Sequence, residues 1–380
     1  MSSFLINILL FILVIGVLTF VHELGHFVLA KLVGAKVFEF ALGFGPKLFS
    51  KTYKGTEYSI RILPLGGYVK ILGDGDPGEE KDKSNVKGNL ARKPKYQQAL
   101  VMLAGVTMNI ILAVVFYYIV LANSNWKLAL GSEFESFKPI GGTISKEKVA
   151  DVEYVELVED GNAKKAGLPA KGVIKSIGGE EISYSDDVGK KLSLYKDKST
   201  IINVCFEDKC KDYNINVSEE GKIGISLAHN YLFVLSYENN KILAGPAHLV
   251  NTLRLIGSKL SEIVNKAQDT GDYTELSNTV SGPIGIYFVI DYFKNFGLIP
   301  FLSIIADLSL SLAVVNLLPI PALDGGRVVI LLVEAIVRKD LDEKIESAII
   351  NISFFLLMLL IIFIMIKDIV NIDSIRNMFL

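Results

Sequence analysis

Four stretches of the chain are dominated by apolar residues and are long enough to cross a lipid bilayer. The first lies within residues 1–34, the second covers 99–122, the third 298–327 and the fourth 348–368. About twenty apolar residues in helical conformation span the hydrocarbon core of a bilayer. The pattern therefore predicts four transmembrane helices, followed by a short tail at residues 369–380.

The segment between the first two apolar stretches, residues 35–98, has a different pattern. Up to residue 72 it consists of short runs of alternating β-branched and aromatic residues, separated by Gly/Pro turn signals, and a charged linker follows. This pattern predicts a β-rich loop. Sheet or irregular backbone at membrane depth has to be covered by protein or line a water-filled cavity, so we expect the loop to associate with the membrane edge.

The remaining segments are more polar. Residues 127–235 contain several strand-like runs and predict one compact, mostly β domain inserted between the second and third helices. Residues 237–297 have apolar positions at helical spacing and predict an amphipathic, interfacial region. Residues 328–347 are predicted to be a loop.

Composition supports a membrane protein and gives no indication of a nucleic-acid partner. The chain is 51% apolar, its mean hydropathy is high, and its formal net charge is only -2. The N-terminal run lacks a basic start and is too long for the apolar region of a secretory signal, so we expect it to be a retained helix.

Basic residues predict the orientation of the helices, because they collect in short cytoplasmic loops. One group lies between the first and second helices, at Lys36, Lys47, Lys51, Lys54, Arg92, Lys93 and Lys95. The other lies between the third and fourth helices, at Arg327, Arg338, Lys339 and Lys344. Both loops are therefore expected in the cytoplasm. The chain termini and the β domain would then lie outside the cell.

Cys205 and Cys210 are the only cysteines, and both lie in a strand-like, polar segment. They are either two small, partly buried side chains or, in an oxidising compartment, a disulfide. A metal site is not favoured, because no further cysteine or nearby histidine joins them.

The first apolar stretch carries the sequence HELGH at residues 22–26. His22 and His26 are four residues apart, so on a helix both face one side and can bind a single Zn²⁺. Glu23 is then placed to act as general base and to pass a proton to a leaving amine. Ionisable groups at membrane depth are costly and indicate function. The motif predicts an intramembrane zinc protease site, with a structural polar patch between helices as the alternative.

A catalytic zinc site needs a third protein ligand and one open position. Asp324 is our candidate, since it is a carboxylate between Leu323 and a Gly-Gly pair at the cytoplasmic end of the third apolar stretch. A turn or helix-capping role is the alternative. With this ligand, both halves of the site fall on the predicted cytoplasmic side.

Substrate contacts are predicted at less distinctive positions. Pro319 and Pro321 break helix regularity and leave room for an extended substrate. Asn109 and Asn316 lie in apolar stretches and either bond one helix to another or hold an unwound substrate backbone. The role of Asp307 is left open, since it either forms a structural pair or takes part in function.

Several motifs in the same order resemble the bacterial site-2 proteases, which are intramembrane zinc metalloproteases. They are HELGH at 22–26, GFGP at 43–46, PLGGYVK at 64–70, SGPIG at 281–285 and NLLPIPALDGG at 316–326. The resemblance covers nearly the whole chain outside residues 127–235. It implies Zn²⁺ on His22, His26 and Asp324, with Glu23 as the catalytic acid and base.

The resemblance also implies roles for other segments. Residues 127–235 resemble an extracytoplasmic PDZ domain, and the β-rich loop with Gly66 and Gly67 would meet the substrate as an added strand. Asn316 matches a position implicated in substrate handling. Substrates would be single-span proteins of the bacterial inner membrane, such as anti-sigma factors or remnant signal peptides, cut within the bilayer.

Two features depart from the family pattern. Family members often carry two PDZ domains and this chain has room for one, and Val106 stands where a Pro usually precedes the Asn of the second helix. An inactive, PDZ-bearing membrane scaffold and an ordinary zinc protease on a membrane anchor are the competing hypotheses. No pattern indicates an oligomeric state.

Overall fold

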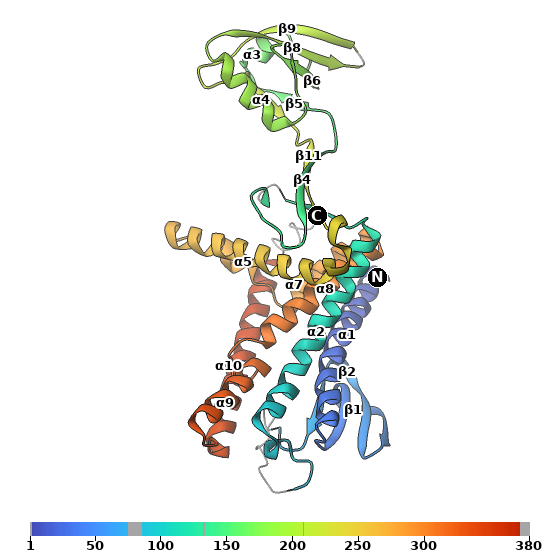
Figure 1. The fold of residues 1–380 in the computed structure, drawn as a ribbon. Helices are drawn as coiled ribbons and strands as arrows, with labels where there is room; N and C mark the ends of the chain where they lie inside the picture. The colour runs from blue at the N-terminus through green and yellow to red at the C-terminus, as the bar shows by residue number, and fades with distance from the viewer. Residues whose placement is uncertain (1, 75–85, 132–133, 208, 373–380) are drawn as a thin grey trace. The chain divides into compact units, whose positions relative to one another are not determined.

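The computed structural model describes residues 2–74, 86–131, 134–207 and 209–372. The chain forms two compact units, of which one comprises Met1–Asn123 with Gly245–Leu380 and the other Ser124–Ala244. The first unit is mostly helical and the second mostly β (Figure 1).

The helices of the first unit include the four that the apolar pattern predicts. Helices α1 from Phe4, α2, α8 and α10 are each long and apolar enough to cross a membrane. The helix bounds are α1 (Ser2–Leu32), α2 (Lys95–Asn123), α5 (Ala244–Thr270), α6 (Thr274–Thr279), α7 (Pro283–Phe293), α8 (Leu298–Asn316), α9 (Asp324–Val337) and α10 (Glu343–Val370).

The third apolar stretch is not one helix, which corrects the prediction of a helix over 298–327 and a loop over 328–347. Helix α8 ends at Asn316, and a separate helix, α9, begins at Asp324 and continues to Val337. Pro319 and Pro321 lie in the break, where they cannot donate the hydrogen bonds that a continuous helix requires.

A pair of glycines allows this break to fold tightly against α9. A Cβ atom on Gly325 would lie 2.2 Å from the carbonyl oxygen of Leu317, and one on Gly326 would lie 2.0 Å from that of Ile320. No side chain fits at either distance. The Gly-Gly pair therefore lets the turn after α8 pack directly on the first turn of α9, which begins with Asp324.

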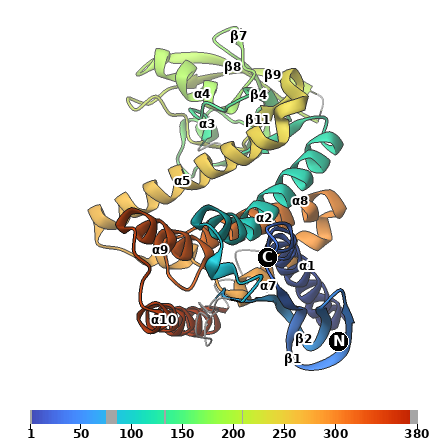
Figure 2. The same ribbon diagram turned by 60° about the horizontal axis from the view of Figure 1, so that its bottom comes forward.

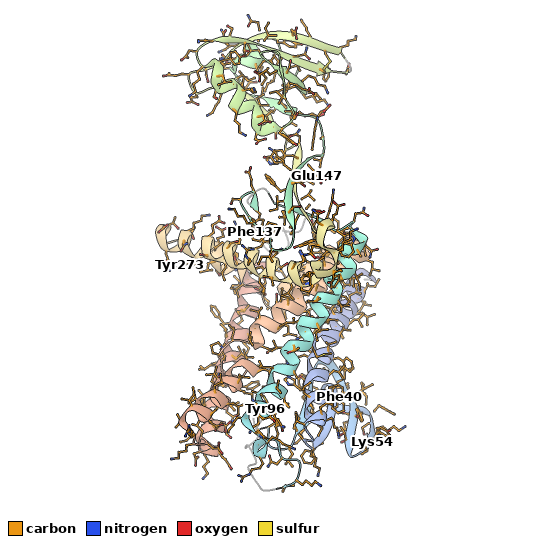
Figure 3. The ribbon with its side chains drawn as sticks, in the orientation of Figure 1. Phe40, Lys54, Tyr96, Phe137, Glu147 and Tyr273 are labelled. Atoms are coloured by element: carbon orange, nitrogen blue, oxygen red, sulfur yellow. A yellow bond between two sulfur atoms is a disulfide. The ribbon has the colours of Figure 1, made fainter. Side chains whose placement is uncertain are left out.

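The predicted β-rich loop is a two-stranded antiparallel sheet, formed by β1 (Val37–Tyr53) and β2 (Thr56–Ile71). It runs beside α1 in both ribbon views (Figures 1 and 2). The Phe40 ring packs edge-on against Phe20 and Phe27 of α1, at centroid distances of 5.7 and 5.2 Å. Figure 3 shows Phe40 beside this helix and Lys54 at the far end of the hairpin. The inner half of the sheet is thereby fixed on α1.

Helices α1 and α2 pack closely because of a glycine. A Cβ on Gly25 would lie only 2.3 Å from the carbonyl oxygen of Ala104. Small residues at such positions let two helix backbones approach in a membrane. This contact brings the part of α1 that carries His22 and His26 against the middle of α2.

The second unit contains two sheets. One has the strand order β10-β5-β6-β8-β9 with β7 paired to β6, and the other has the order β3-β11-β4. Cys205 and Cys210 form a disulfide across β8 and β9, which decides between the two interpretations of the cysteines. The bounds are β3 (Lys127–Leu130), β4 (Thr143–Lys148), β5 (Glu153–Leu157), α3 (Asn162–Lys165), β6 (Gly172–Ile177), β7 (Glu180–Glu181), α4 (Ser185–Leu192), β8 (Ser199–Phe206), β9 (Lys209–Asn216), β10 (Ile225–Leu227) and β11 (Tyr231–Ser236).

A buried asparagine stabilises this unit, and its removal gives a first testable prediction. The Oδ1 atom of Asn230 accepts a hydrogen bond from the Ser185 amide, and its Nδ2 atom donates to the carbonyls of Ala150 and Ser183. Each buried group left unpaired costs about 1–3 kcal/mol. We expect Asn230→Ala to speed amide hydrogen exchange around Ser185 in the full-length protein.

The matched control for this prediction is Asn203→Ala. Asn203 bonds Asp212 on the exposed side of the sheet, so its loss should leave exchange near Ser185 unchanged. Equal protection in the two variants would contradict the role assigned to Asn230.

Candidate metal centre

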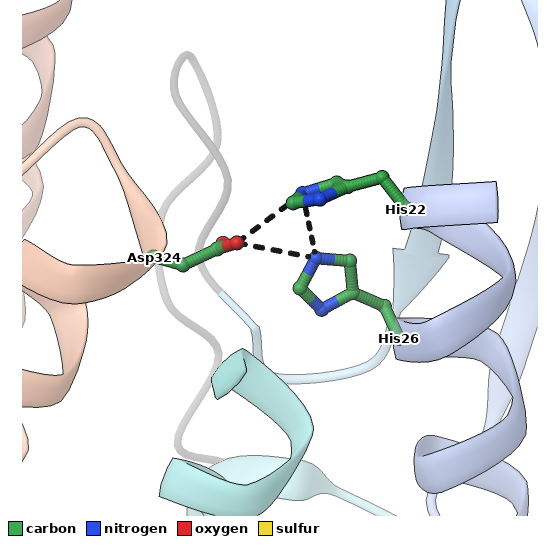
Figure 4. A group of neighbouring side chains, drawn as sticks. All are labelled: His22, His26 and Asp324. Carbon is green, nitrogen blue, oxygen red and sulfur yellow. Dashed lines mark hydrogen bonds and ion pairs between the residues drawn. The ribbon is translucent and has the colours of Figure 1, made fainter. Parts of the chain in front are cut away.

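Three side chains from distant parts of the chain converge at one point (Figure 4). The Nε2 atoms of His22 and His26, both on α1, are 3.2 Å apart. The Oδ2 atom of Asp324, at the start of α9, lies 3.2 Å from the first and 3.4 Å from the second. Both histidines are buried. The three residues form the one His/Cys/Asp/Glu group with metal-binding spacing within the described residues.

These distances fit a tetrahedral zinc site. Zn²⁺ bonds to nitrogen and oxygen are about 2.0–2.1 Å long, which places neighbouring ligand atoms of a tetrahedron about 3.3–3.4 Å apart. The three separations in this site are 3.2, 3.2 and 3.4 Å. The Oδ2 atom of Asp324 is buried and has no hydrogen-bond partner among the described residues. Two imidazoles and one carboxylate also match the donor types that zinc prefers.

Helix α2 closes the other side of the histidine pair. Its Gly105 leaves space there, since a Cβ on this residue would lie 2.4 Å from Nε2 of His26 and 2.8 Å from Nε2 of His22. The Nδ1 atom of His26 lies 2.8 Å from the carbonyl oxygen of Val101. The Nδ1 atom of His22 lies 3.1 Å from Nδ2 of Asn109. Each imidazole is thus oriented through its Nδ1 atom, with Nε2 directed toward Asp324.

The cluster opens into a cavity of about 530 Å³. Glu23, the predicted general base, lines this cavity together with the three clustered residues. Other walls come from the hairpin, the turn after it, α2, α9 and α10, namely Glu39, Phe44, Tyr68, Val69, Lys70, Ile71, Asp74, Met102, Arg327 and Phe354. The cavity therefore places a carboxylate beside the metal-binding group and provides apolar surface for a substrate.

A polar network in the hairpin lines one side of the cavity. The Glu39 carboxylate accepts hydrogen bonds from Ser59, Arg61 and Tyr68, at 2.7, 2.8 and 3.0 Å. Burial acts to raise the pKa of Glu39, but these hydrogen bonds outweigh it and hold the pKa below its usual value. Burial and the bond to Glu39 raise the pKa of Tyr68 to about 12. At neutral pH the cavity therefore has an ionised Glu39 and a neutral Tyr68.

Sequence reasoning did not identify this network. The three partners lie 20 to 29 residues from Glu39 in the chain and meet it only through the register of the hairpin. The available signal was the charged Glu39 and Arg61 within otherwise strand-like, apolar runs.

The residues predicted to bind substrate fall in three places. Asn109 is fully buried against His22. Asn316 ends α8, and Pro319 and Pro321 lie in the turn that follows, beside Asp324 in the chain but outside the residues that line the described cavity. Gly66 and Gly67 lie on β2. A Cβ on Gly67 would be 3.5 Å from Cγ of Glu23 and one on Gly66 would be 2.6 Å from the Phe44 ring, so both glycines pack against residues that line the cavity.

Asp307, whose role the sequence left open, is paired. Its Oδ1 atom accepts a 2.6 Å hydrogen bond from the Tyr117 hydroxyl, which joins α8 to α2 away from the metal-binding group. This contact is the structural pairing that the sequence offered as one of the two roles of Asp307.

Comparison with known proteins identifies the class. The profile of peptidase family M50 matches residues 10–360. A Clostridium perfringens protein provisionally named a zinc metalloprotease is 35% identical over 363 residues, which cover 94% of this chain and 97% of that protein. A similarly named Fusobacterium nucleatum protein is 30% identical over 367 residues, which cover 92% of this chain and 96% of that protein. The chain belongs to peptidase family M50.

The family assignment confirms the resemblance that the motifs indicated. The protein is a zinc-dependent metalloendopeptidase of a membrane-embedded family. A second clostridial protein, from Clostridium acetobutylicum, is 35% identical over 380 residues, which cover 96% of this chain and 97% of that protein.

Proposed function

We propose that this protein cleaves transmembrane segments of single-span membrane proteins, with zinc held by His22, His26 and Asp324 and with Glu23 as the acid–base residue. The observation that supports this proposal best is the position of the metal-binding group. Two of its members lie within α1, one of the four helices that are long and apolar enough to cross a bilayer.

The chain's own residues supply the proton transfers of the proposed reaction. A zinc ion held by His22, His26 and Asp324 would supply Lewis acidity toward the scissile carbonyl and would lower the pKa of a water molecule bound to it. Glu23 takes a proton from the water whose oxygen attacks the carbonyl carbon. It then delivers that proton to the amide nitrogen as the carbon–nitrogen bond breaks, so that a carboxylic acid and an amine result.

A substrate helix must unwind locally, because the hydrogen bonds of an intact helix shield its peptide groups. We propose that the turn between α8 and α9 and the strand β2 receive the unwound segment. Asn316 would hold its backbone, Pro319 and Pro321 would keep the turn open, and Gly66 and Gly67 would let it approach the sheet. The closeness of Gly67 to Glu23 supports this arrangement.

We propose that the protein lies in the bacterial cytoplasmic membrane with its site toward the cytoplasm. The lysines and arginines that flank α1, α2, α9 and α10 support this orientation. The unit Ser124–Ala244 would then be an extracytoplasmic PDZ domain that binds or excludes substrate ectodomains. Its Cys205–Cys210 disulfide is typical of an oxidising compartment. Anti-sigma factors and remnant signal peptides are the substrate types that the family resemblance suggests.

Removal of the metal tests the assignment. A chelator should stop the purified protein from cutting a single-span test substrate in detergent, and added Zn²⁺ should restore cleavage. Asp324→Ala should abolish cleavage and lower zinc content, because it removes one of three ligands.

The matched control is Asp272→Ala, at an exposed turn after α5. This variant should retain both zinc and activity. Continued cleavage by zinc-free protein, or full zinc content in Asp324→Ala, would contradict the proposed site.

A further inference from the structure

We propose that Asn109 is a positioning residue of the metal centre. In this role its amide oxygen accepts a hydrogen bond from Nδ1 of His22 and holds the imidazole with Nε2 free to bind zinc. The inference rests on the ligand set proposed above. The sequence left two roles open for Asn109, and this inference takes the bond between helices in place of substrate binding.

The first step of the argument is burial. Asn109 is 0% exposed, and its amide lies 3.1 Å from Nδ1 of His22. It is not among the residues that line the described cavity. A substrate therefore cannot reach this side chain without a rearrangement of α1 and α2, whereas the imidazole already contacts it.

The second step concerns the proton on each imidazole. A neutral imidazole carries one N–H. An imidazole that binds a metal through Nε2 must therefore have its proton on Nδ1. For His26 the partner of Nδ1 is the Val101 carbonyl, which can only accept, and this fixes the required tautomer. For His22 the partner is a primary amide, which can accept or donate. Only the amide oxygen directed at Nδ1 fits a metal-binding His22.

The third step is an acceptor without a partner. The Oδ1 atom of Asn109 is buried and has no hydrogen-bond partner among the described residues. A half-turn of the amide about its Cβ–Cγ bond exchanges the positions of Oδ1 and Nδ2 and pairs this oxygen with Nδ1–H of His22. Leaving such a buried acceptor unpaired is unfavourable, because it has lost its bonds to water. One hydrogen bond therefore both pairs the Asn109 oxygen and holds the imidazole of His22.

The backbone around Asn109 is arranged for this role. Val101, Gly105 and Asn109 are four residues apart on α2 and therefore share one face of the helix. They present to the histidine pair a carbonyl acceptor, a space without a side chain, and an amide. The Ser309 hydroxyl donates to the carbonyl of Asn109 at 2.8 Å, which anchors this point of α2 to α8.

The test measures zinc affinity of the full-length protein in detergent, by competition with a chromophoric chelator. Asn109→Leu removes the acceptor with little change in volume and should weaken zinc binding about 10- to 100-fold, as losses of such supporting contacts do. Asn109→Asp keeps an acceptor and should bind zinc at least as tightly as the wild type. Thr107→Val, two residues away at an exposed position on α2, should not change the affinity.

A second readout separates positioning from a general effect on folding. With Co²⁺ in place of zinc, the visible absorption bands should change in Asn109→Leu and return toward the wild-type spectrum in Asn109→Asp. If Asn109→Leu does not fold, the Asp variant still tests the inference, because zinc binding weaker than wild type would contradict it.

Other results would overturn the inference or its foundation. Unchanged zinc affinity in Asn109→Leu together with a raised KM would assign Asn109 to the substrate. Unchanged affinity in His22→Ala would instead refute the ligand set, which is a failure of the proposed function and not of the role of Asn109 alone.

Discussion

Glu23→Gln is expected to stop cleavage and to leave zinc bound. Glutamine has nearly the same shape as glutamate, but its amide cannot take a proton from the attacking water. General acid–base groups contribute about 10²–10⁴-fold to the rate, so kcat should fall by about that factor. Zinc content should stay at the wild-type level, because Glu23 is not one of the three clustered residues.

Measurement of zinc content and of cleavage in the same preparation checks this expectation. Glu262→Gln is the matched control, since Glu262 is exposed on α5 and pairs with Lys259, and it should cleave at the wild-type rate. In cells, fragments of single-span proteins should accumulate when Glu23 is replaced. Cleavage at the normal rate by Glu23→Gln would contradict the acid–base role of Glu23 and would require another proton acceptor. Absence of cleavage by the wild type as well would instead favour the inactive-scaffold hypothesis.

The parts of the fold that the sequence predicts well are those that depend on local properties. The length and apolarity of a segment decide whether it can cross a bilayer, and the four apolar helices follow from this alone. The spacing of His22 and His26 is likewise a property of one helix, so their proximity was predictable. Asp324 was found only because a zinc site requires a third ligand.

The sequence was less informative about how Asp324 reaches the site. It placed Asp324 at the end of a helix, whereas the structure places it at the start of α9. The prolines that end α8 were visible in the sequence. The packing of Gly325 and Gly326 against the carbonyls of Leu317 and Ile320 was not, because it depends on how the turn folds back.

Contacts between distant residues explain the other differences. Asn109 is 87 residues from His22 in the chain, and an asparagine in an apolar helix has many potential partners. The Glu39 network depends on a strand register that shifts several times around Gly43. Alternation of polar and apolar residues does not predict such shifts.

Gly105→Ala is expected to remove zinc from the protein, because the added methyl group would occupy the space next to the metal-binding atoms. The new Cβ would lie 2.4 Å from Nε2 of His26, and 2.7 and 2.8 Å from Cε1 and Nε2 of His22. Contacts below 3.0 Å force the imidazoles apart, so the ligand geometry that fits a tetrahedral ion is lost. We expect at least a 100-fold loss of zinc affinity and no detectable cleavage.

The same change should affect global stability much less, and a second glycine shows why. Overpacking costs about 1–3 kcal/mol, but alanine in place of glycine within a helix recovers up to about 1 kcal/mol. In Gly257→Ala on α5 the added Cβ meets no atom within 4 Å, so this variant should keep its zinc and melt at an equal or higher temperature. Zinc content by elemental analysis and thermal melting of both variants make the comparison. Full zinc content in Gly105→Ala would mean that the histidines do not bind the metal through the atoms that face α2.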